Sequence, residues 1–449
     1  MSNQTVNELE NEVDSIFSEL AEDPWIPGRL LVKLRRSVPP VGSFGLDLDR
    51  QAIASMEDTL KSLGCEGLES LYSLSGNLEA FGDSDSVLGV DGPDSDKALS
   101  FLLRFDPEAM SSSDALTLIQ GRPEVSAACR DGYRYAFQQP GTAFGGQPWA
   151  SIAVGLAQAW DLGASGAGIK VAFLDTGVNS THPPIRGHIV SGMDFVDLGS
   201  TPPPFNWRWA GDFKQPDAQP DDDVGHGTKM AGLIGGDVVG MAPNCELLPV
   251  RVLARMEHQS DGRVTGYGSI SDVIRGIDWA VSQGASILNM SFGFPTSTWA
   301  EREAVKRAFR KNCLLVGAIG NSGASGALQF PAAFSEVLSV GSVDVDLAVS
   351  AFSQRGDHLD LVAPGGKVST VDSNGNREEV SGTSCAAAIV SGIAALVRSV
   401  RPNLTVARVI EVLCRSANRA NRPGPFPSRD CGFGLIHAGA AVSAARSLP

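Results

Sequence analysis

The feature that most constrains the fold is a set of four short, almost continuous apolar runs. They read GIKVAFLDTG, ASILNMSFG, CLLVGAIGN and VLSVGSVD, at residues 168–177, 285–293, 313–321 and 337–344. Strands that are buried on both faces have this pattern. Helical patterns such as SISDVIRGIDWAVSQG and WAEREAVKRAFRKN separate them. This alternation predicts a doubly wound α/β domain with a mostly parallel sheet.

The preceding part of the chain is predicted to form a smaller α+β domain over residues 26–137. Its patterns follow the order strand, helix, strand, strand, helix, strand, which is typical of a ferredoxin-like, split β-α-β unit. An acidic extension at 1–25 precedes it, and a Gly- and Pro-rich linker at 138–148 separates it from the large domain at 149–449. A stretch rich in Gly, Asp and Ser, residues 80–98, is expected to be an exposed insertion.

Charge and composition exclude several function classes. A formal net charge of -15 argues against nucleic-acid binding, which needs clustered Lys and Arg. The N-terminus has neither the basic nor the apolar region of a secretory signal, and no apolar stretch is long enough to be a membrane anchor. We therefore expect a cytoplasmic protein with no membrane partner, although non-classical export stays open. The seven scattered cysteines have no metal-ligand spacing, so no metal site is expected from them.

Three polar residues stand at predicted strand ends or helix starts, each close to glycine: Asp175, His226 and Ser384. Taken singly, they suit an Asx turn, a structural histidine and a helix cap. Together they are the groups that nucleophilic acyl transfer requires. The imidazole would take the proton of the serine hydroxyl, and the carboxylate would hold the imidazole in the right tautomer. Asn321, at the end of another strand, is the candidate donor to the oxyanion.

Five stretches of the sequence resemble those of the subtilisin-like serine proteases. They read VAFLDTGVNSTHP, HGTKMAG with VGMAPNCELLPVRVL after it, LNMSFGFP, AIGNSG and GTSCAAAIVSGIAALV. The order Asp, His, Ser is also the order in subtilisin. The resemblance runs from about Trp149 to the closing CGFGLIHAGAAV and implies Asp175, His226 and Ser384 as the triad, with Asn321 as oxyanion donor. Cys385 departs from the family pattern, which usually has Met there.

The resemblance also implies a zymogen. The first domain is similar to the family's inhibitory propeptide, whose tail lies in the active site and ends at the residue cleaved first. Here that residue would be Phe137, with cleavage before Gln138, and the linker through Phe144 is the alternative. The prodomain would then be an intramolecular inhibitor of its own protease.

Substrate is expected to add a strand between two segments of the large domain. Main-chain hydrogen bonds give the affinity in this binding mode, and pockets select the side chains. Phe292, Ala318 and Ile319 would wall an uncharged pocket that favours an apolar residue before the cleaved bond. The resemblance gives as substrate-binding residues Gly266, Tyr267, Gly268, Ser291, Phe292, Gly293, Ala318, Ile319 and Gly320.

The segment STPPPFNWRWAGDFKQPDAQPDDD, residues 200–223, is expected to be a solvated loop. Two alternatives remain open for it: contact with basic substrate residues, or calcium binding through Asp221, Asp222 and Asp223, since calcium prefers carboxylate oxygens. The proposed chemistry itself requires no cofactor.

The sequence thus indicates a serine endopeptidase made as a zymogen, acting on peptide or protein substrates, with precursor or leader-peptide processing as its role. Two alternatives stay open. The same triad would serve an acyl-transfer ligase or macrocyclase, and the fold would also serve a non-catalytic peptide-binding protein locked by its own prodomain.

Overall fold

The structure is a computed structural model, and it describes residues 24–35, 56, 59–65, 67–71, 100–136, 142–143, 149–204, 206–372, 374, 376–419 and 425–448. The acidic extension up to residue 23, the insertion at 80–98, and the expected processing residues Phe137 and Gln138 lie outside these ranges.

The N-terminal unit, by which we mean the described residues from 24 to 136, has its described strands and helix α3 in the predicted order along the chain. Its strands pair antiparallel in the order β2-β3-β1-β4. The side chain of Ser111 accepts a hydrogen bond from the Asp114 N–H and so caps helix α3. Leu30, Phe101 and Ile119 belong to its apolar core. The elements are β1 (Trp25–Leu34), β2 (Gly67–Ser70), β3 (Ser100–Arg104), α3 (Ser112–Gln120) and β4 (Val125–Ala136).

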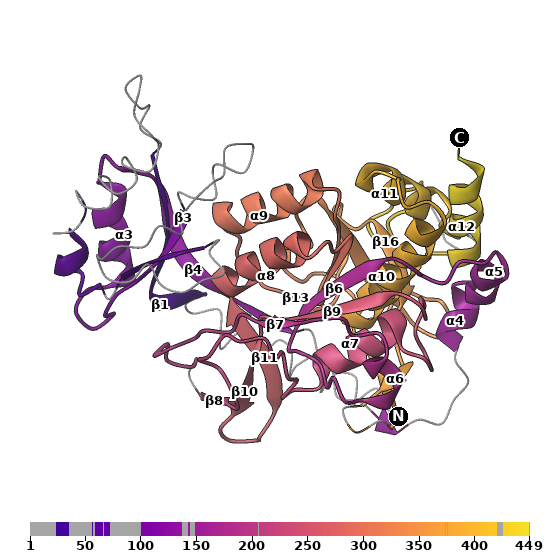
Figure 1. Cartoon of the computed structure of the whole chain (residues 1–449), viewed down its shortest axis with the longest axis horizontal. Coiled ribbons are helices and arrows are strands. Elements are labelled where there is room, and N and C mark those ends of the chain that lie inside the picture. The colour runs from indigo at the N-terminus through magenta and orange to yellow at the C-terminus, as the bar shows by residue number, and fades with distance from the viewer. Residues whose placement is uncertain are drawn as a thin grey trace.

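The C-terminal unit, residues 149–448, is built on a parallel seven-stranded sheet with the order β16-β15-β14-β12-β6-β9-β7 (Figure 1). Every pairing in it is parallel, as the continuous apolar runs predict. Its strands are β6 (Lys170–Asp175), β7 (Met193–Asp194), β9 (Glu246–Arg251), β12 (Ile287–Met290), β14 (Leu314–Ala318), β15 (Val337–Val343) and β16 (Leu361–Pro364).

Helices cover both faces of this sheet. On one face, α7 (His226–Gly235) and α10 (Thr383–Val400) pack against a set of strand residues that includes Val171 and Phe173, and α12 (Ala438–Ser447) packs on α10. On the other face, α8 (Ile270–Ser282) and α9 (Trp299–Arg310) pack against the alternate residues, such as Ala172 and Leu174. The doubly wound class predicted from the sequence is therefore confirmed.

Helix α10 is the central helix of the core. Within the described residues it is the one helix whose length and apolar composition would allow it to cross a membrane, so the expectation that no apolar stretch has this length is wrong. Of that stretch, 89% is buried inside the protein. Short helices complete the unit at its edges: α4 (Trp149–Ala153), α5 (Leu156–Asp161), α6 (Pro183–Arg186) and α11 (Val406–Arg415).

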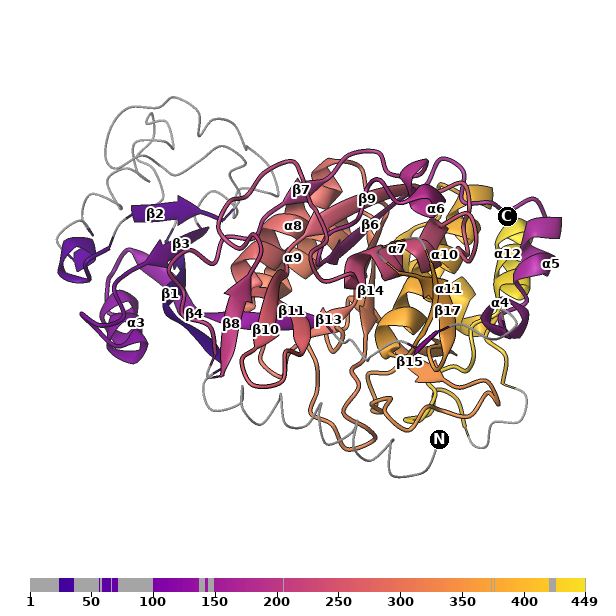
Figure 2. The same cartoon turned by 90° about the horizontal axis from the view of Figure 1, so that it is seen from below.

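Strand β4 joins the two units. Its last residues pair antiparallel with β11 (Val264–Ser269) on one side and with β13 (Phe292–Gly293) on the other. Figure 2 shows β4 passing from the N-terminal unit into line with these two strands. Leu31 and Leu102, on the sheet of the N-terminal unit, belong to the same apolar cluster as Val273 of α8. The N-terminal unit is thus packed on the C-terminal unit through apolar contacts as well as through β4.

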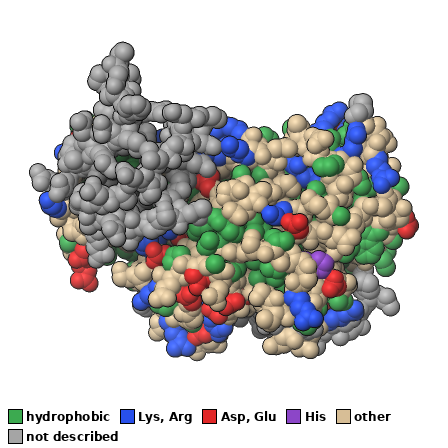
Figure 3. Space-filling view, in the orientation of Figure 1, with side chains coloured by type: hydrophobic (Ala, Val, Ile, Leu, Met, Phe, Trp, Pro, Cys, Tyr) green, Lys and Arg blue, Asp and Glu red, His purple; other side chains and the backbone are tan. Residues whose placement is uncertain are grey.

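The expectation of a solvated loop at 200–223 is wrong in part. Residues Trp207–Ala210 form strand β8, which pairs with β10 (Ala254–His258), and β10 pairs with β11. Trp207 is 1% exposed. Arg208 and Arg255 both form ion pairs with Glu257. Figure 3 shows acidic and basic side chains side by side on the part of the surface where β8, β10 and β11 lie. Trp207 contacts His258 of β10, and Trp209 contacts Tyr267 of β11. The polar composition of the segment gave no sign of these two contacts.

A small antiparallel sheet lies beside the start of α10. It has the order β17-β18-β5 and consists of β17 (Val368–Val371), β18 (Arg377–Val380) and β5 (Thr142–Ala143). Two residues of the predicted linker are therefore held against β18.

Candidate active site

The carboxyl ends of three neighbouring strands bring the predicted residues to one edge of the parallel sheet. Leu174 of β6 pairs with Met290 of β12, and Met290 pairs with Gly317 of β14. The next residues along these strands, Asp175, Ser291 and Ala318, therefore follow one another across the sheet edge. Ligand and catalytic sites of open α/β sheets form at this edge.

His226 lies against Asp175. It is the first residue of α7, and its Nδ1 atom is 2.6 Å from the Oδ1 atom of Asp175. Both side chains are buried, at 2% and 0% exposure. The same Oδ1 accepts the backbone N–H of Thr176. A carboxylate can only accept, so Nδ1 carries the hydrogen and Nε2 is left as the basic nitrogen. Within the described residues Nε2 has no hydrogen-bond partner.

Ser384 lies next to Ser291, and thus at the same sheet edge. Its hydroxyl donates to the carbonyl oxygen of Ser291 at 3.1 Å, while the Ser291 hydroxyl donates to the carbonyl oxygen of Ser384 at 3.3 Å. Ser384 is the second residue of α10 and is 1% exposed. The helix N-terminus supplies a positive partial charge where negative charge would develop on a bound carbonyl.

Asn321 is held by the residue that precedes Ser384. Its Oδ1 atom accepts from the backbone N–H of Thr383 at 2.9 Å and from the Thr383 hydroxyl at 2.8 Å. Because the carbonyl end of the amide is fixed in this way, its nitrogen Nδ2 is left to donate elsewhere. Asn321 is 4% exposed, so such a donor acts in a site largely shielded from water.

Cys385 is no competing nucleophile. It is buried, and desolvation raises the pKa of its thiol to about 12. The reactive form of cysteine is the thiolate. At neutral pH the hydroxyl of Ser384 is thus the nucleophile offered at the start of α10.

The two expected substrate-binding segments hold a strand of the chain itself. Tyr135 pairs with both Tyr267 of β11 and Gly293 of β13, and Ala136 pairs with Phe292. Gly266 borders this strand, since a Cβ atom placed on it would lie 3.4 Å from the Cβ of Ala136 and 2.4 Å from Cγ2 of Thr176. The described end of β4 therefore lies between the two segments as an extended strand, in the place that we call the groove.

The expected pocket wall is uncharged and buried. Ala318 and Ile319 are each 0% exposed. Gly320 has φ +113°, and a Cβ there would lie 2.0 Å from Oε1 of Gln354, so only glycine fits that position. Ala318 is the last residue of β14, and Ile319 and Gly320 lead from it to Asn321.

Asp222 is a residue whose role was missed in the sequence. One of its oxygens accepts from the Thr176 hydroxyl and the Gly225 N–H, and the other accepts from the N–H and the hydroxyl of Thr228. It therefore ties the start of α7, which carries His226, to the end of β6. In the sequence, a run of aspartates is separated from His226 by Val and Gly, and capping chemistry gives such a run a structural meaning.

The calcium alternative finds no support in these contacts. The oxygens of Asp222 are already used by hydroxyl and N–H donors, and a carboxylate oxygen of Asp223 lies 3.6 Å from Arg251. Within the part of the chain that the structure describes, no group of three or more His, Cys, Asp or Glu side chains is arranged to hold a metal ion.

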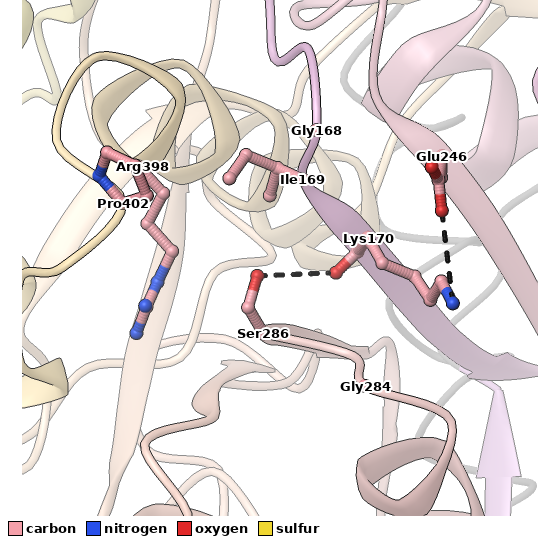
Figure 4. Close-up of a pocket in the computed structure, with 8 residues that line it drawn as sticks. All are labelled: Gly168, Ile169, Lys170, Glu246, Gly284, Ser286, Arg398 and Pro402. Carbon is pink, nitrogen blue, oxygen red and sulfur yellow. Dashed lines mark hydrogen bonds and ion pairs between the residues drawn. The ribbon is translucent and has the colours of Figure 1, made fainter.

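A separate cavity of about 330 Å³ lies at the opposite end of the strands (Figure 4). Lys170 and Glu246, which begin β6 and β9, line it and form an ion pair of 3.8 Å. Arg398, near the end of α10, points toward the same space. Since the strands begin here and the predicted residues stand where they end, this cavity is not part of the candidate active site.

Comparisons with known proteins place the chain in a family. The model of the Subtilase family matches residues 166–434. The chain is 34% identical over 300 residues to the "Thermostable alkaline protease" of Halalkalibacterium halodurans, which covers 66% of this chain and 73% of that protein. It is 38% identical over 249 residues to the "Major intracellular serine protease" of Bacillus subtilis, with 54% and 71% covered. It is 33% identical over 300 residues to "Subtilisin Savinase" of Lederbergia lenta, with 66% and 98% covered.

Proposed function

The chain belongs to the subtilase family and is a subtilisin-like serine endopeptidase, and from this premise we propose that Asp175, His226 and Ser384 are its catalytic triad. The observation that carries the proposal is the buried contact of 2.6 Å between His226 Nδ1 and Asp175 Oδ1, at the sheet edge where Ser291 holds Ser384.

Each residue has a defined part in the reaction. The hydroxyl of Ser384 turns from Ser291 toward His226, and as it attacks the peptide carbonyl its proton passes to Nε2. Asp175 keeps the other nitrogen protonated and stabilises the imidazolium that forms. The proton then goes to the leaving amine, and water hydrolyses the acyl-enzyme by the same route in reverse.

Asn321 is proposed to donate through Nδ2 to the oxyanion of the tetrahedral intermediate. Asn321→Ala is expected to lower kcat by about 10²- to 10³-fold with little change in KM, because the donor acts mainly in the transition state. Asn321→Asp keeps an acceptor for Thr383 but loses the donor, so the same loss is expected. Steady-state hydrolysis of a fluorogenic peptide measures both, with the exposed Asn244→Ala as control. A kcat within threefold of wild type for both variants would contradict the assignment.

The N-terminal unit is proposed to be an inhibitory prodomain, and the chain a zymogen. Support comes from the register of β4, in which Tyr135 faces Gly293 and Ala136 faces Phe292. The residue next to Phe292 in the groove is Ser291, whose carbonyl oxygen accepts from Ser384, so a peptide bound in the register of β4 would reach Ser384 one residue after the place that Ala136 occupies. The proposed cleavage therefore lies between Phe137 and Gln138, two residues outside the described ranges.

The proposed biological role is processing of a precursor or leader peptide, with the prodomain guarding against indiscriminate cleavage. An intracellular setting is supported by the relative from Bacillus subtilis, whose name places it inside the cell. Incubation with a candidate precursor should release one defined fragment. Rapid degradation of casein at many sites would instead indicate bulk digestion.

A fluorophosphonate probe tests the catalytic proposal against the binding-protein alternative. The probe reacts with an activated serine, so wild type should be labelled on Ser384, and the label can be located by peptide mapping. Labelling on no residue, even after limited trypsin has removed the N-terminal unit, would contradict the triad and favour a peptide-binding protein.

Product mass separates hydrolysis from the ligase alternative, since ligation or cyclisation retains no added water.

A further inference from the structure

Strand β4 carries a fully buried arginine into the groove. Arg134 is 0% exposed and pairs with Gly268 in the strand register. Its Nε donates to Oε1 of Glu301 at 2.9 Å, and its Nη2 contacts Oε2 of Glu301 and the carbonyl oxygen of Thr296. Its Nη1 donates to the carbonyl oxygen of Tyr133 at 2.6 Å. The guanidinium is thus bound on all three of its nitrogens.

Glu301 is a carboxylate in a fully buried position, where charged residues are rare. It lies in the first turn of α9, where Thr298 caps the helix by accepting the Glu301 N–H, and its side chain is 0% exposed. Desolvation raises the pKa of its carboxyl group, and the positive charge of Arg134 opposes that shift. A buried carboxylate without a cation partner is costly, so the position favours a positive charge in the groove.

The groove itself supplies most of the arginine's partners. Both oxygens of Glu301 and the carbonyl oxygen of Thr296 belong to the C-terminal unit. The remaining acceptor, the Tyr133 carbonyl, is backbone of the inserted strand, and any peptide bound in the same register brings an equivalent one. A substrate that replaced β4 would therefore meet the same three acceptors.

We propose that Glu301 selects substrates with arginine at the fourth residue before the cleaved bond. The inference rests on the proposed function, in which Phe137 is the residue before that bond and Arg134 lies three residues earlier. Arginine is favoured over lysine because its planar fork presents Nε and Nη2 together to one carboxylate. A neutral side chain at that position would leave Glu301 buried and unpaired.

Peptide hydrolysis tests this selection directly. Fluorogenic peptides with the sequence Tyr-Arg-Tyr-Ala-Phe before the reporter are compared with matched peptides that carry Lys or Gln in place of Arg. In processed wild type, we expect kcat/KM for the Arg peptide to exceed that for the Gln peptide by about 30-fold, with Lys between them. In Glu301→Gln the ratio should fall below about threefold. Glu303→Gln, on the same helix but paired with Lys306 at the surface, should keep the wild-type ratio.

Cleavage of the chain by itself gives a second measurement that needs no added substrate. Arg134→Gln should slow processing, and Arg134→Gln combined with Glu301→Gln should restore part of the rate, because neither partner is then left as an unpaired buried charge. If the double variant regains processing, the slow processing of Arg134→Gln comes from the unpaired Glu301 and not from a failure to fold.

The outcomes separate this inference from the proposed function. Normal fluorophosphonate labelling with equal cleavage of the Arg and Gln peptides would overturn the selection by Glu301. The pair of Arg134 and Glu301 would then serve only to hold the N-terminal unit on the C-terminal unit. Absence of both labelling and cleavage in wild type would overturn the proposed function and this inference with it. A preference for the Arg peptide that is lost in Glu301→Gln but kept in Glu303→Gln supports both the selection by Glu301 and the proposed function.

Discussion

A chain with Ser384→Ala should hydrolyse peptides about 10⁶-fold more slowly than wild type, the loss that removal of the corresponding hydroxyl causes in subtilisin itself. Without the hydroxyl no acyl-enzyme forms, and His226 has no proton to accept. The substitution removes the hydroxyl that donates to the Ser291 carbonyl and leaves the backbone of α10 unchanged, so the fold should be retained. The measurement is kcat for a fluorogenic peptide, with circular dichroism to check the fold.

Ser399→Ala serves as the matched control for this variant. Ser399 lies near the other end of α10, where its hydroxyl donates to Leu396 and accepts the N–H of Gly166. Near-normal hydrolysis by Ser399→Ala beside none by Ser384→Ala would assign the loss to the hydroxyl rather than to the helix. If Ser384→Ala kept more than about a hundredth of the wild-type rate, another nucleophile would have to carry the reaction.

Asp175→Asn should lower kcat by about 10⁴-fold. Asp175 accepts at Oδ1 from both His226 and Thr176. An amide at this position can turn its NH₂ group toward the ring, which then keeps its proton on Nε2, the nitrogen that must accept the proton of Ser384. The substrate groove is untouched, so KM should change little.

The same kinetic assay checks this second prediction, with Asp161→Asn, an exposed substitution at the end of α5, as control. A loss smaller than tenfold would mean that Asp175 does not set the tautomer of His226. A large loss accompanied by an altered melting temperature would point instead to the packing of the buried carboxylate.

The sequence predicted the parallel sheet well because its strands are buried on both faces, which leaves little choice of residue. Val171 and Phe173 had to be apolar for one layer of helices, and Ala172 and Leu174 for the other. Polar residues that end such strands stand out, but Asp175 and Asn321 taken alone suited turns, and it was their combination with a histidine and a serine that predicted a catalytic site. Ser384 was found from the helix start that it shares with Gly and Thr.

Other parts of the molecule depend on contacts between segments far apart in the chain, and the local sequence gives only weak indications of such contacts. Strand β8 was taken for a loop because prolines and aspartates surround it, although Trp207 and Trp209 alternate with polar or small residues. Glu301 was not singled out in the sequence, since nothing local shows that Arg134, 167 positions away along the chain, pairs with it. Asp222 was named only as one of three possible calcium ligands in an expected loop, because the hydroxyls that donate to it, those of Thr176 and Thr228, have no pattern of their own.

The measurement that most directly tests the central claim is the intact mass, under denaturing conditions, of purified wild type beside Ser384→Ala. The account predicts that wild type is divided between Phe137 and Gln138, whereas Ser384→Ala stays a single chain of 47.0 kDa. If wild type also stayed whole, or if both proteins were cut at the same place, the chain would not be a zymogen that processes itself through Ser384.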